Sequence, residues 1–234
     1  MRVFAGPNGS GKTTIIKSLI SEIPFGIYVN ADDIETLLRE SRVLLFNTFQ
    51  LKVSELEIQS FFKNSQFAPI KRNEPDLWEN LKVLENILHV NTIVDSYLAA
   101  DLAEFIRQKL LENQISFTYE TVMSHRSKLD FLKKAKDSGY KIYLYYVATE
   151  DPRINVSRVN FRVIQHGHFV EPDLIEKRYY KSLKLLKEAI ITSDRAFIWD
   201  NSSNASNLFA EIIDGRDVKI LDIENVPNWF VEYL

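Results

Sequence analysis

Apolar residues fall along this chain in two patterns, short unbroken runs and runs spaced three or four residues apart. The first pattern is typical of strands buried on both faces, and the second is typical of helices with one apolar face. Strands are predicted at Val3–Ala5, Gly26–Asn30, Ile115–Tyr119, Lys141–Val147, Ala196–Trp199 and Val218–Leu221. Helices are predicted at about 13–22, 31–39, 93–110, 126–136, 152–165 and 172–191. The alternation of strand and helix predicts an α/β fold with a doubly wound, mostly parallel sheet.

The pattern loosens between Ser41 and about His89. Apolar residues at 53–62 and again at Trp78–Leu88 have helical spacing, and Pro69–Pro75 is predicted to be a turn or an exposed loop. We therefore expect a single P-loop kinase-like domain over 1–234, with a helical insertion at 41–89. The aromatic residues of this insertion are more often core residues than a ligand platform.

Composition narrows the possible classes of protein. The hydrophobic content of 45% is enough for a full core, and the apolar runs are too short to cross a bilayer. There is no cysteine, which excludes disulfides and thiolate metal sites. The sequence enters its first motif directly after Met1–Ala5, leaving no room for a signal peptide, so we expect a cytoplasmic protein without membrane contact. A net charge of −3 argues against bulk nucleic-acid binding.

The first motif is a phosphate-binding loop that matches G-x-x-x-x-G-K-[ST] at every fixed position. Three of the chain's seven glycines lie in it, and the predicted strand and helix flank it as the motif requires. Lys12 is expected to reach the β- and γ-phosphates of ATP, and Thr13 to ligate Mg²⁺. The predicted nucleotide-binding residues are Gly6, Pro7, Asn8, Gly9, Ser10, Gly11, Lys12, Thr13 and Thr14. A plain glycine-rich turn is the weaker reading.

Carboxylates follow two further strands, and such strand ends meet at one edge of a parallel sheet. Asp32 and Asp33 follow the second strand, and Glu120 with Thr121 follows the strand before 126–136. A carboxylate beside the γ-phosphate could accept a proton from a hydroxyl or hold water on Mg²⁺. The alternatives are helix capping for Asp32 and Asp33 and a solvated strand end for Glu120.

Basic residues are concentrated between Arg153 and Lys187, a segment that contains eight Lys or Arg and only three Asp or Glu. Arg158 and Arg162 lie one helical turn apart and repel each other unless an anion lies between them. Together with Arg178 they are candidates for a lid that stabilises a transferring phosphoryl group, and a solvated basic face is the alternative. His166 and His168 flank Gly167, where turn geometry is favoured over a zinc site.

These motifs together resemble the zeta toxin family of P-loop kinases. The matching segments are Gly6–Thr14, Val29–Ile34, Phe117–Ser124, Gly139-Tyr140, Arg158–Arg162, Gly167-His168, Pro172 and Arg178-Tyr179. Glu35 and His166 depart from the usual pattern of the family, and 41–89 lies outside the resemblance.

The resemblance implies ATP-dependent phosphorylation of a hydroxyl on a UDP-activated amino sugar, and an antitoxin protein as a partner. By position, it implies that Asp32 accepts the proton and that Glu120 and Thr121 contact the substrate. The resemblance also implies that two of Arg158, Arg162 and Arg178 are lid arginines.

Two other functions compete with a small-molecule kinase. In an ATPase or nucleotide switch acting on a protein, Asp200 would follow its apolar strand as a Walker-B-like acid. The lack of a Leu-Ser-Gly-Gly-Gln-type segment argues against a transporter ATPase. A binding module without activity is the third possibility. Labelled ATP with a panel of nucleotide sugars would distinguish them.

Overall fold

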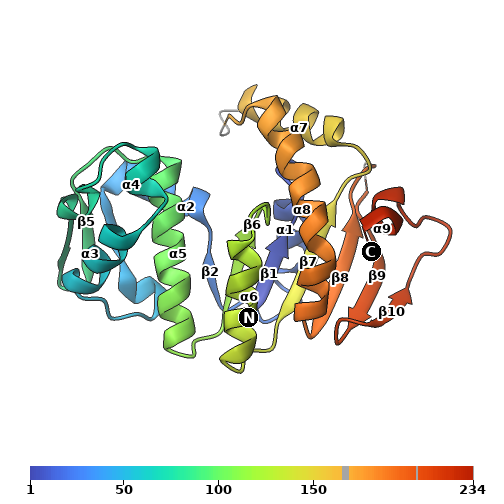
Figure 1. Cartoon of the computed structure of the whole chain (residues 1–234), viewed down its shortest axis with the longest axis horizontal. Helices are drawn as coiled ribbons and strands as arrows, with labels where there is room; N and C mark the ends of the chain where they lie inside the picture. Colours follow the sequence, from blue (N-terminus) through green and yellow to red (C-terminus); the bar gives the residue numbers. More distant parts are fainter. Residues whose placement is uncertain (165–168, 204, 234) are drawn as a thin grey trace. The chain divides into compact units, whose positions relative to one another are not determined.

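The computed structural model describes residues 1–164, 169–203 and 205–233 (Figure 1). The chain divides into two compact units. The first unit comprises Met1–Gly26 and Thr118–Leu234, and the second comprises Ile27–Phe117. None of the helices within the described residues has the length and hydropathy needed to cross a bilayer.

The first unit is built on a mostly parallel sheet in which the strands follow the order β10-β9-β8-β7-β1-β6. Strands β1 (Arg2–Ala5), β6 (Phe117–Thr121), β7 (Tyr143–Ala148) and β8 (Arg195–Asp200) run parallel. Strands β9 (Asn207–Ile213) and β10 (Asp217–Ile220) continue the sheet in antiparallel pairing. The parallel part confirms the predicted α/β fold.

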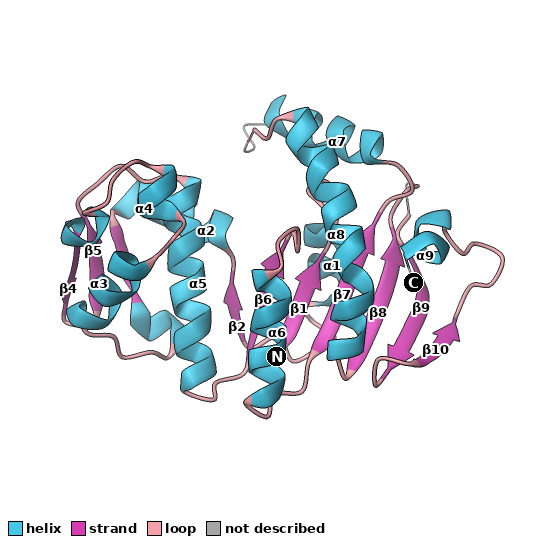
Figure 2. Cartoon of the chain, viewed as in Figure 1, coloured by secondary structure: helices cyan, strands magenta, loops and turns pink. Residues whose placement is uncertain are grey.

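Helices cover both faces of this sheet (Figure 2). Helices α6 (Ser127–Asp137) and α8 (Pro172–Thr192) lie in front of the strands, and α1 (Lys12–Leu19) lies behind them. Helices α7 (Pro152–Ile164) and α9 (Asn228–Tyr233) complete the unit. The sequence analysis had not predicted β9 or α9.

Aromatic side chains form much of the core on both faces of the sheet. On one face the rings of Phe4, Tyr145 and Phe197 stack across three neighbouring strands, with centroids 4.5 and 5.0 Å apart. On the other face Tyr146 contacts Trp229 of α9. The unbroken apolar run of β7 is explained by this packing, because β7 is central and is buried on both faces.

The second unit contains both helices and a small antiparallel sheet of order β3-β5-β4. Its elements in chain order are β2 (Ile27–Val29), α2 (Ala31–Ser41), β3 (Val43–Leu45), η1 (Phe46–Phe49), α3 (Glu55–Asn64), α4 (Ala68–Lys71), η2 (Leu77–Asn80), β4 (Leu81–Leu84), β5 (Ile87–Val90) and α5 (Ser96–Glu112). The long helix α5 packs against α2, α3 and α4. The segment 41–89 lies within this wider unit.

The helix predicted over Trp78–Leu88 is wrong, because most of that segment forms the hairpin β4–β5. The turn is made by Glu85 and Asn86, whose φ angles of 52° and 65° are both left-handed. The Asn86 side chain holds this turn by accepting from the N–H of Val53 and donating to the carbonyl of Leu51. Without a glycine at the turn, the apolar spacing of this segment resembles that of a helix.

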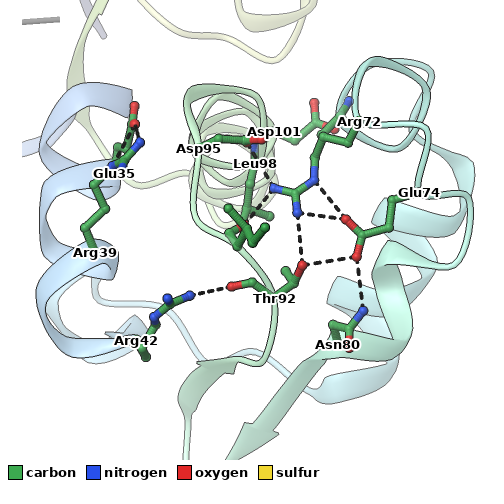
Figure 3. Close-up of polar contacts among 12 residues, drawn as sticks. Glu35, Arg39, Arg42, Arg72, Glu74, Asn80, Thr92, Asp95, Leu98 and Asp101 are labelled. Atoms are coloured by element: carbon green, nitrogen blue, oxygen red, sulfur yellow. Dashed lines mark hydrogen bonds and ion pairs between the residues drawn. The ribbon is translucent and has the colours of Figure 1, made fainter.

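A buried arginine joins the loops that precede α5 (Figure 3). The Arg72 guanidinium donates to the Glu74 carboxylate at 2.7 Å and to the Thr92 hydroxyl at 2.9 Å, and it lies 3.1 Å from Asp95. Thr92 in turn donates to Glu74, and Asp95 caps α5 through the N–H of Leu98. Every charge in this network has a partner, so we interpret it as a structural element of the second unit.

Candidate functional site

The phosphate-binding loop joins β1 to α1 and requires glycine at three positions. Gly6, Gly9 and Gly11 have φ angles of 140°, 73° and 95°. A Cβ atom on Gly6 would lie 2.0 Å from the carbonyl oxygen of Val147, and one on Gly9 would lie 2.5 Å from that of Asn155. The loop is therefore tightly enclosed by its neighbours, and only glycine combines these backbone angles with this lack of space.

Lys12 lies inside the curve of this loop. Its side chain is 7% exposed, and its ammonium group donates to the carbonyl oxygens of Gly6 and Pro7 at 2.9 and 3.0 Å. The same Nζ atom lies 3.8 Å from Oε1 of Glu120. A cation held in this way is placed to meet an anion that enters the loop.

Two further observations indicate that the loop can bind a triphosphate. Helix α1 begins without a side-chain cap, since Gly11 is its N-cap, so its first N–H groups can serve an anion. Asn8 Oδ1 and Ser10 Oγ are buried and have no hydrogen-bond partner within the described structure. Thr13 and Thr14 are exposed in the first turn of α1, where the Thr13 hydroxyl could ligate Mg²⁺ together with phosphate oxygens.

Glu120 and Thr121 are the last residues of β6 rather than residues beyond it. The parallel register pairs Ala5 with Thr121, which places both residues at the edge of the sheet where the loop begins. The Thr121 hydroxyl accepts from the N–H of Met123 and so fixes the start of the following turn. In the first unit, the structure therefore brings together Lys12, Glu120 and Thr121.

Asp32 and Asp33 lie in the first turn of α2, in the second unit. The N–H of Asp32 donates to Oδ1 of Asn30, so Asn30 is the residue that caps this helix. Burial, together with the negative charge of Asp32, raises the pKa of the Asp33 carboxyl. Asn30 supplies the side-chain cap, and both acids lie in the first turn, where the helix dipole favours negative charge.

Glu35 is buried one turn further along α2 and accepts two hydrogen bonds from Arg39, at 2.6 and 3.0 Å (Figure 3). Glu35 and Arg39 thus form an i, i+4 ion pair on α2.

The three candidate arginines differ in their surroundings. Arg158 of α7 is half-buried and donates to the carbonyl oxygens of Asn201 and Ser203 at 2.7 and 3.2 Å. Arg162 is exposed one turn further along α7, and Arg178 is half-buried on α8. Arg158 therefore anchors the loop after β8, whereas Arg162 has the exposure that a lid residue needs. His166 and His168 lie outside the described residues.

Asp200 ends β8, where a Walker-B acid would be expected, but its carboxylate has other partners. It accepts from the Ser202 hydroxyl at 2.7 Å and from the Trp229 indole N–H at 3.0 Å. The described residues contain no group of three acidic or histidine side chains arranged to hold a metal ion. Asp200 thus has a structural use in joining α9 to the turn after β8.

Two asparagines that the sequence analysis did not single out contact the loop directly. Asn155 of α7 donates to the carbonyl of Asn8 at 2.6 Å, and Asn201 donates to that of Ser10 at 2.8 Å. They are 147 and 191 residues from their partners, and asparagine is frequent in loops. No local sequence signal could have identified them.

A family model described as zeta toxin matches residues 91–209 of the chain. That match begins after the phosphate-binding loop, which the sequence motif identifies independently. An uncharacterized protein of Haemophilus influenzae is 32% identical over 69 residues, which is 30% of this chain and 49% of that protein.

Among solved structures, the chain is similar to the AvrRxo1-ORF1:AvrRxo1-ORF2 complex with sulphate ions (TM-score 0.55, 12% identity) and to the same complex with ATP (TM-score 0.53, 11% identity). In both, the likeness covers 99% of this chain and 62% of the other. The chain thus spans less than two thirds of these relatives, and the structural likeness shows a shared fold.

Proposed function

This chain belongs to the zeta toxin family, whose model matches 119 of its 234 residues, and from that premise we propose that it transfers the γ-phosphate of ATP to a hydroxyl of a nucleotide sugar such as UDP-N-acetylglucosamine. Membership, together with the phosphate-binding loop, supports a P-loop phosphotransferase. The ATP-bound state of one structural neighbour supports the choice of nucleotide. The acceptor rests on the family resemblance of the sequence.

The observation that carries the proposal is the position of Lys12, an ammonium group held within the loop and 3.8 Å from Glu120. In the proposed reaction the loop N–H groups and Lys12 bind the β- and γ-phosphates. Thr13 would hold Mg²⁺, which supplies charge neutralisation on the phosphate oxygens. Glu120 and Thr121 then orient the acceptor at the same strand edge.

Asp32 is the proposed general base. It would take the proton from the acceptor hydroxyl as the bond from oxygen to phosphorus forms and the bond to the leaving ADP breaks. Asp33, next to Asp32 in the first turn of α2, would contact the acceptor. Arg162 and Arg178 would neutralise the transferring group, while Arg158 both contributes charge and anchors the loop after β8.

The test uses γ-labelled ATP with a panel of nucleotide sugars and asks where the label is found. We expect the label in a sugar product, and a loss of at least about 100-fold in turnover for Asp32→Asn. Glu40→Gln, at an exposed position on the same helix, is the matched control and should turn over normally. Label found only in free phosphate would show ATP hydrolysis and contradict the kinase assignment. Normal turnover by Asp32→Asn would show that Asp32 is not the general base.

We also propose a protein partner that restrains the enzyme, an antitoxin. The family name and the two-protein complex formed by a structural neighbour support this proposal. Expression of the wild type should arrest bacterial growth, and Lys12→Ala should not. A neighbouring small reading frame that restores growth and co-purifies with the chain would identify the partner. Growth unaffected by the wild-type protein would contradict a toxin role while leaving the kinase assay intact.

A further inference from the structure

Asn155 joins the phosphate-binding loop to the rest of the first unit through a fully buried side chain. Its amide nitrogen donates to the Asn8 carbonyl at 2.6 Å, and its amide oxygen accepts from the Thr149 hydroxyl. The Asn8 carbonyl can only accept, so the Nδ2 end of the amide faces the loop, and the Thr149 hydroxyl holds the amide there by donating to its Oδ1 end.

Thr149 is itself held in place. It is fully buried, and its backbone carbonyl accepts from the Tyr179 hydroxyl of α8 at 2.5 Å. The backbone of Asn155 also closes on Gly9, where an added Cβ would lie 3.0 Å from the Cα of Asn155. A chain of hydrogen bonds therefore runs from Tyr179 of α8 through Thr149, just after β7, and Asn155 of α7 to one peptide group of the loop.

Asn201 makes the equivalent contact two residues further along the loop. Its amide nitrogen donates to the Ser10 carbonyl, and an added Cβ on Gly11 would lie 2.0 Å from that nitrogen. The N–H of Asn201 donates to Ala148, and its carbonyl accepts from Arg158. Because α7 carries both Arg158 and Asn155, one helix supports both contacts.

A trans peptide group is planar, so its carbonyl and the following N–H point in opposite directions. When Asn155 holds the Asn8 carbonyl, the N–H of Gly9 must point away from Asn155. The Ser10 carbonyl and the N–H of Gly11 are related in the same way through Asn201. We infer that Asn155 and Asn201 are positioning residues that orient the peptide planes Asn8–Gly9 and Ser10–Gly11, so that two loop N–H groups are directed at the phosphates.

This inference rests on the proposed binding of ATP, so the experiment is designed to test the positioning role and ATP binding separately. ATP with Mg²⁺ and inorganic tripolyphosphate are titrated calorimetrically into the wild type, Asn155→Asp and Thr149→Val. We expect binding of both ligands to weaken about tenfold in Asn155→Asp, which loses the donor, and severalfold in the uncharged Thr149→Val. The KM for the acceptor should not change, because both side chains are fully buried behind the loop.

Tyr179→Phe and Tyr146→Phe form a matched pair of controls. Both tyrosines are buried and each makes a hydrogen bond, but the Tyr146 hydroxyl bonds to Ser182 at 2.9 Å, whereas the Tyr179 hydroxyl donates to the Thr149 carbonyl. Tyr179→Phe should weaken nucleotide binding severalfold, and Tyr146→Phe should bind as the wild type does. If both variants lose affinity in proportion to their loss of stability, the role is merely structural and the inference is overturned.

The amide NMR signals of Gly9 and Gly11 provide a readout without ligand. The Gly9 signal should shift in Thr149→Val and Asn155→Asp but not in Tyr146→Phe, whereas the Gly11 signal, whose peptide plane Asn201 holds, should stay in place. If Asn155→Asp folds poorly, Thr149→Val alone provides the measurement. Unchanged signals with wild-type affinity would overturn the inference and leave the proposed function standing. A wild type that binds neither ATP nor tripolyphosphate would overturn the proposed function. The NMR signals of the variants would then still show whether the asparagines orient the loop peptide planes.

Discussion

At the scale of single residues, the glycines of this chain are constrained to different degrees. Gly9 and Gly139 have similar left-handed φ angles of 73° and 84°. A Cβ on Gly9 would meet the backbone oxygen of Asn155 at 2.5 Å, whereas a Cβ on Gly139 would meet nothing within 4 Å. The phosphate-loop motif includes Gly9, and Gly139 directly follows Ser138, the C-cap of α6. Only the structure shows which one also lacks space.

Gly9→Ala and Gly139→Ala therefore form a matched pair. Gly139→Ala should lower the free energy of unfolding by about 1 kcal/mol, because backbone strain is its only cost. Gly9→Ala carries the same strain and must also displace Asn155, so it should destabilise more and weaken ATP binding at least about tenfold. Denaturant unfolding and ATP titration measure the two effects. Equal effects of both substitutions would mean that the contact with Asn155 is not rigid.

At the scale of elements, the hydrophobic period of the sequence predicted most of the helices and strands. The hairpin β4–β5 was wrongly predicted as a helix. Helix α3 was predicted from its apolar spacing, and the structure adds a capping box in which Ser54 and Glu57 bond reciprocally. Glu57 also accepts from Lys109 of α5 at 2.7 Å. The hydrogen bonds from Lys109 and from the backbone and hydroxyl of Ser54 lower the pKa of Glu57 from 4.5 to about 2.

This shift predicts a pH-dependent contribution to stability. Because the folded pKa is depressed, the stabilisation is fully present above pH 4.5 and is lost as the pH falls toward about 2. Glu57→Gln should lower the free energy of unfolding at pH 7 by about 1 kcal/mol, a modest value because the side chain is 41% exposed and solvent screens the pair. The difference from the wild type should shrink between pH 4.5 and pH 2 in denaturant unfolding.

Glu112→Gln is the control, since Glu112 also pairs with Lys109 at 2.9 Å but takes no part in the capping box. Its effect at pH 7 should be smaller than that of Glu57→Gln. A loss for Glu57→Gln that stays constant from pH 7 to pH 2 would mean that the ionised carboxylate is not the stabilising species.

At the scale of the whole molecule, strands far apart in sequence are brought together by the topology of the sheet. Strand β1 lies between β6 and β7, so Glu120 and Asn155 both reach the phosphate-binding loop, although each is more than a hundred residues from it in the sequence. A ligand bound there stabilises the folded chain by mass action, and the size of the effect reports its affinity.

We accordingly expect ATP with Mg²⁺, at about 100 times its Kd, to stabilise the wild type by about 2.7 kcal/mol. Differential scanning fluorimetry should show the corresponding rise in Tm. Lys12→Ala should show little or no rise, and Lys17→Ala, at an exposed position on the same helix, should match the wild type. An equal rise in Lys12→Ala would place the nucleotide elsewhere.

The sequence by itself determined the loop, its lysine and threonine, the alternation of strands and helices, and the carboxylates at the strand ends. These features are local, because backbone angles, hydrophobic period and motif spacing act over a few residues. The tertiary structure alone decided that Asn155 and Asn201 hold the loop carbonyls, that Arg158 anchors a loop, that Asp200 serves α9, and that 81–90 is a hairpin. Each of these depends on partners distant in the chain or on a turn without glycine, and the burial that selects such contacts exists only once the strands are assembled.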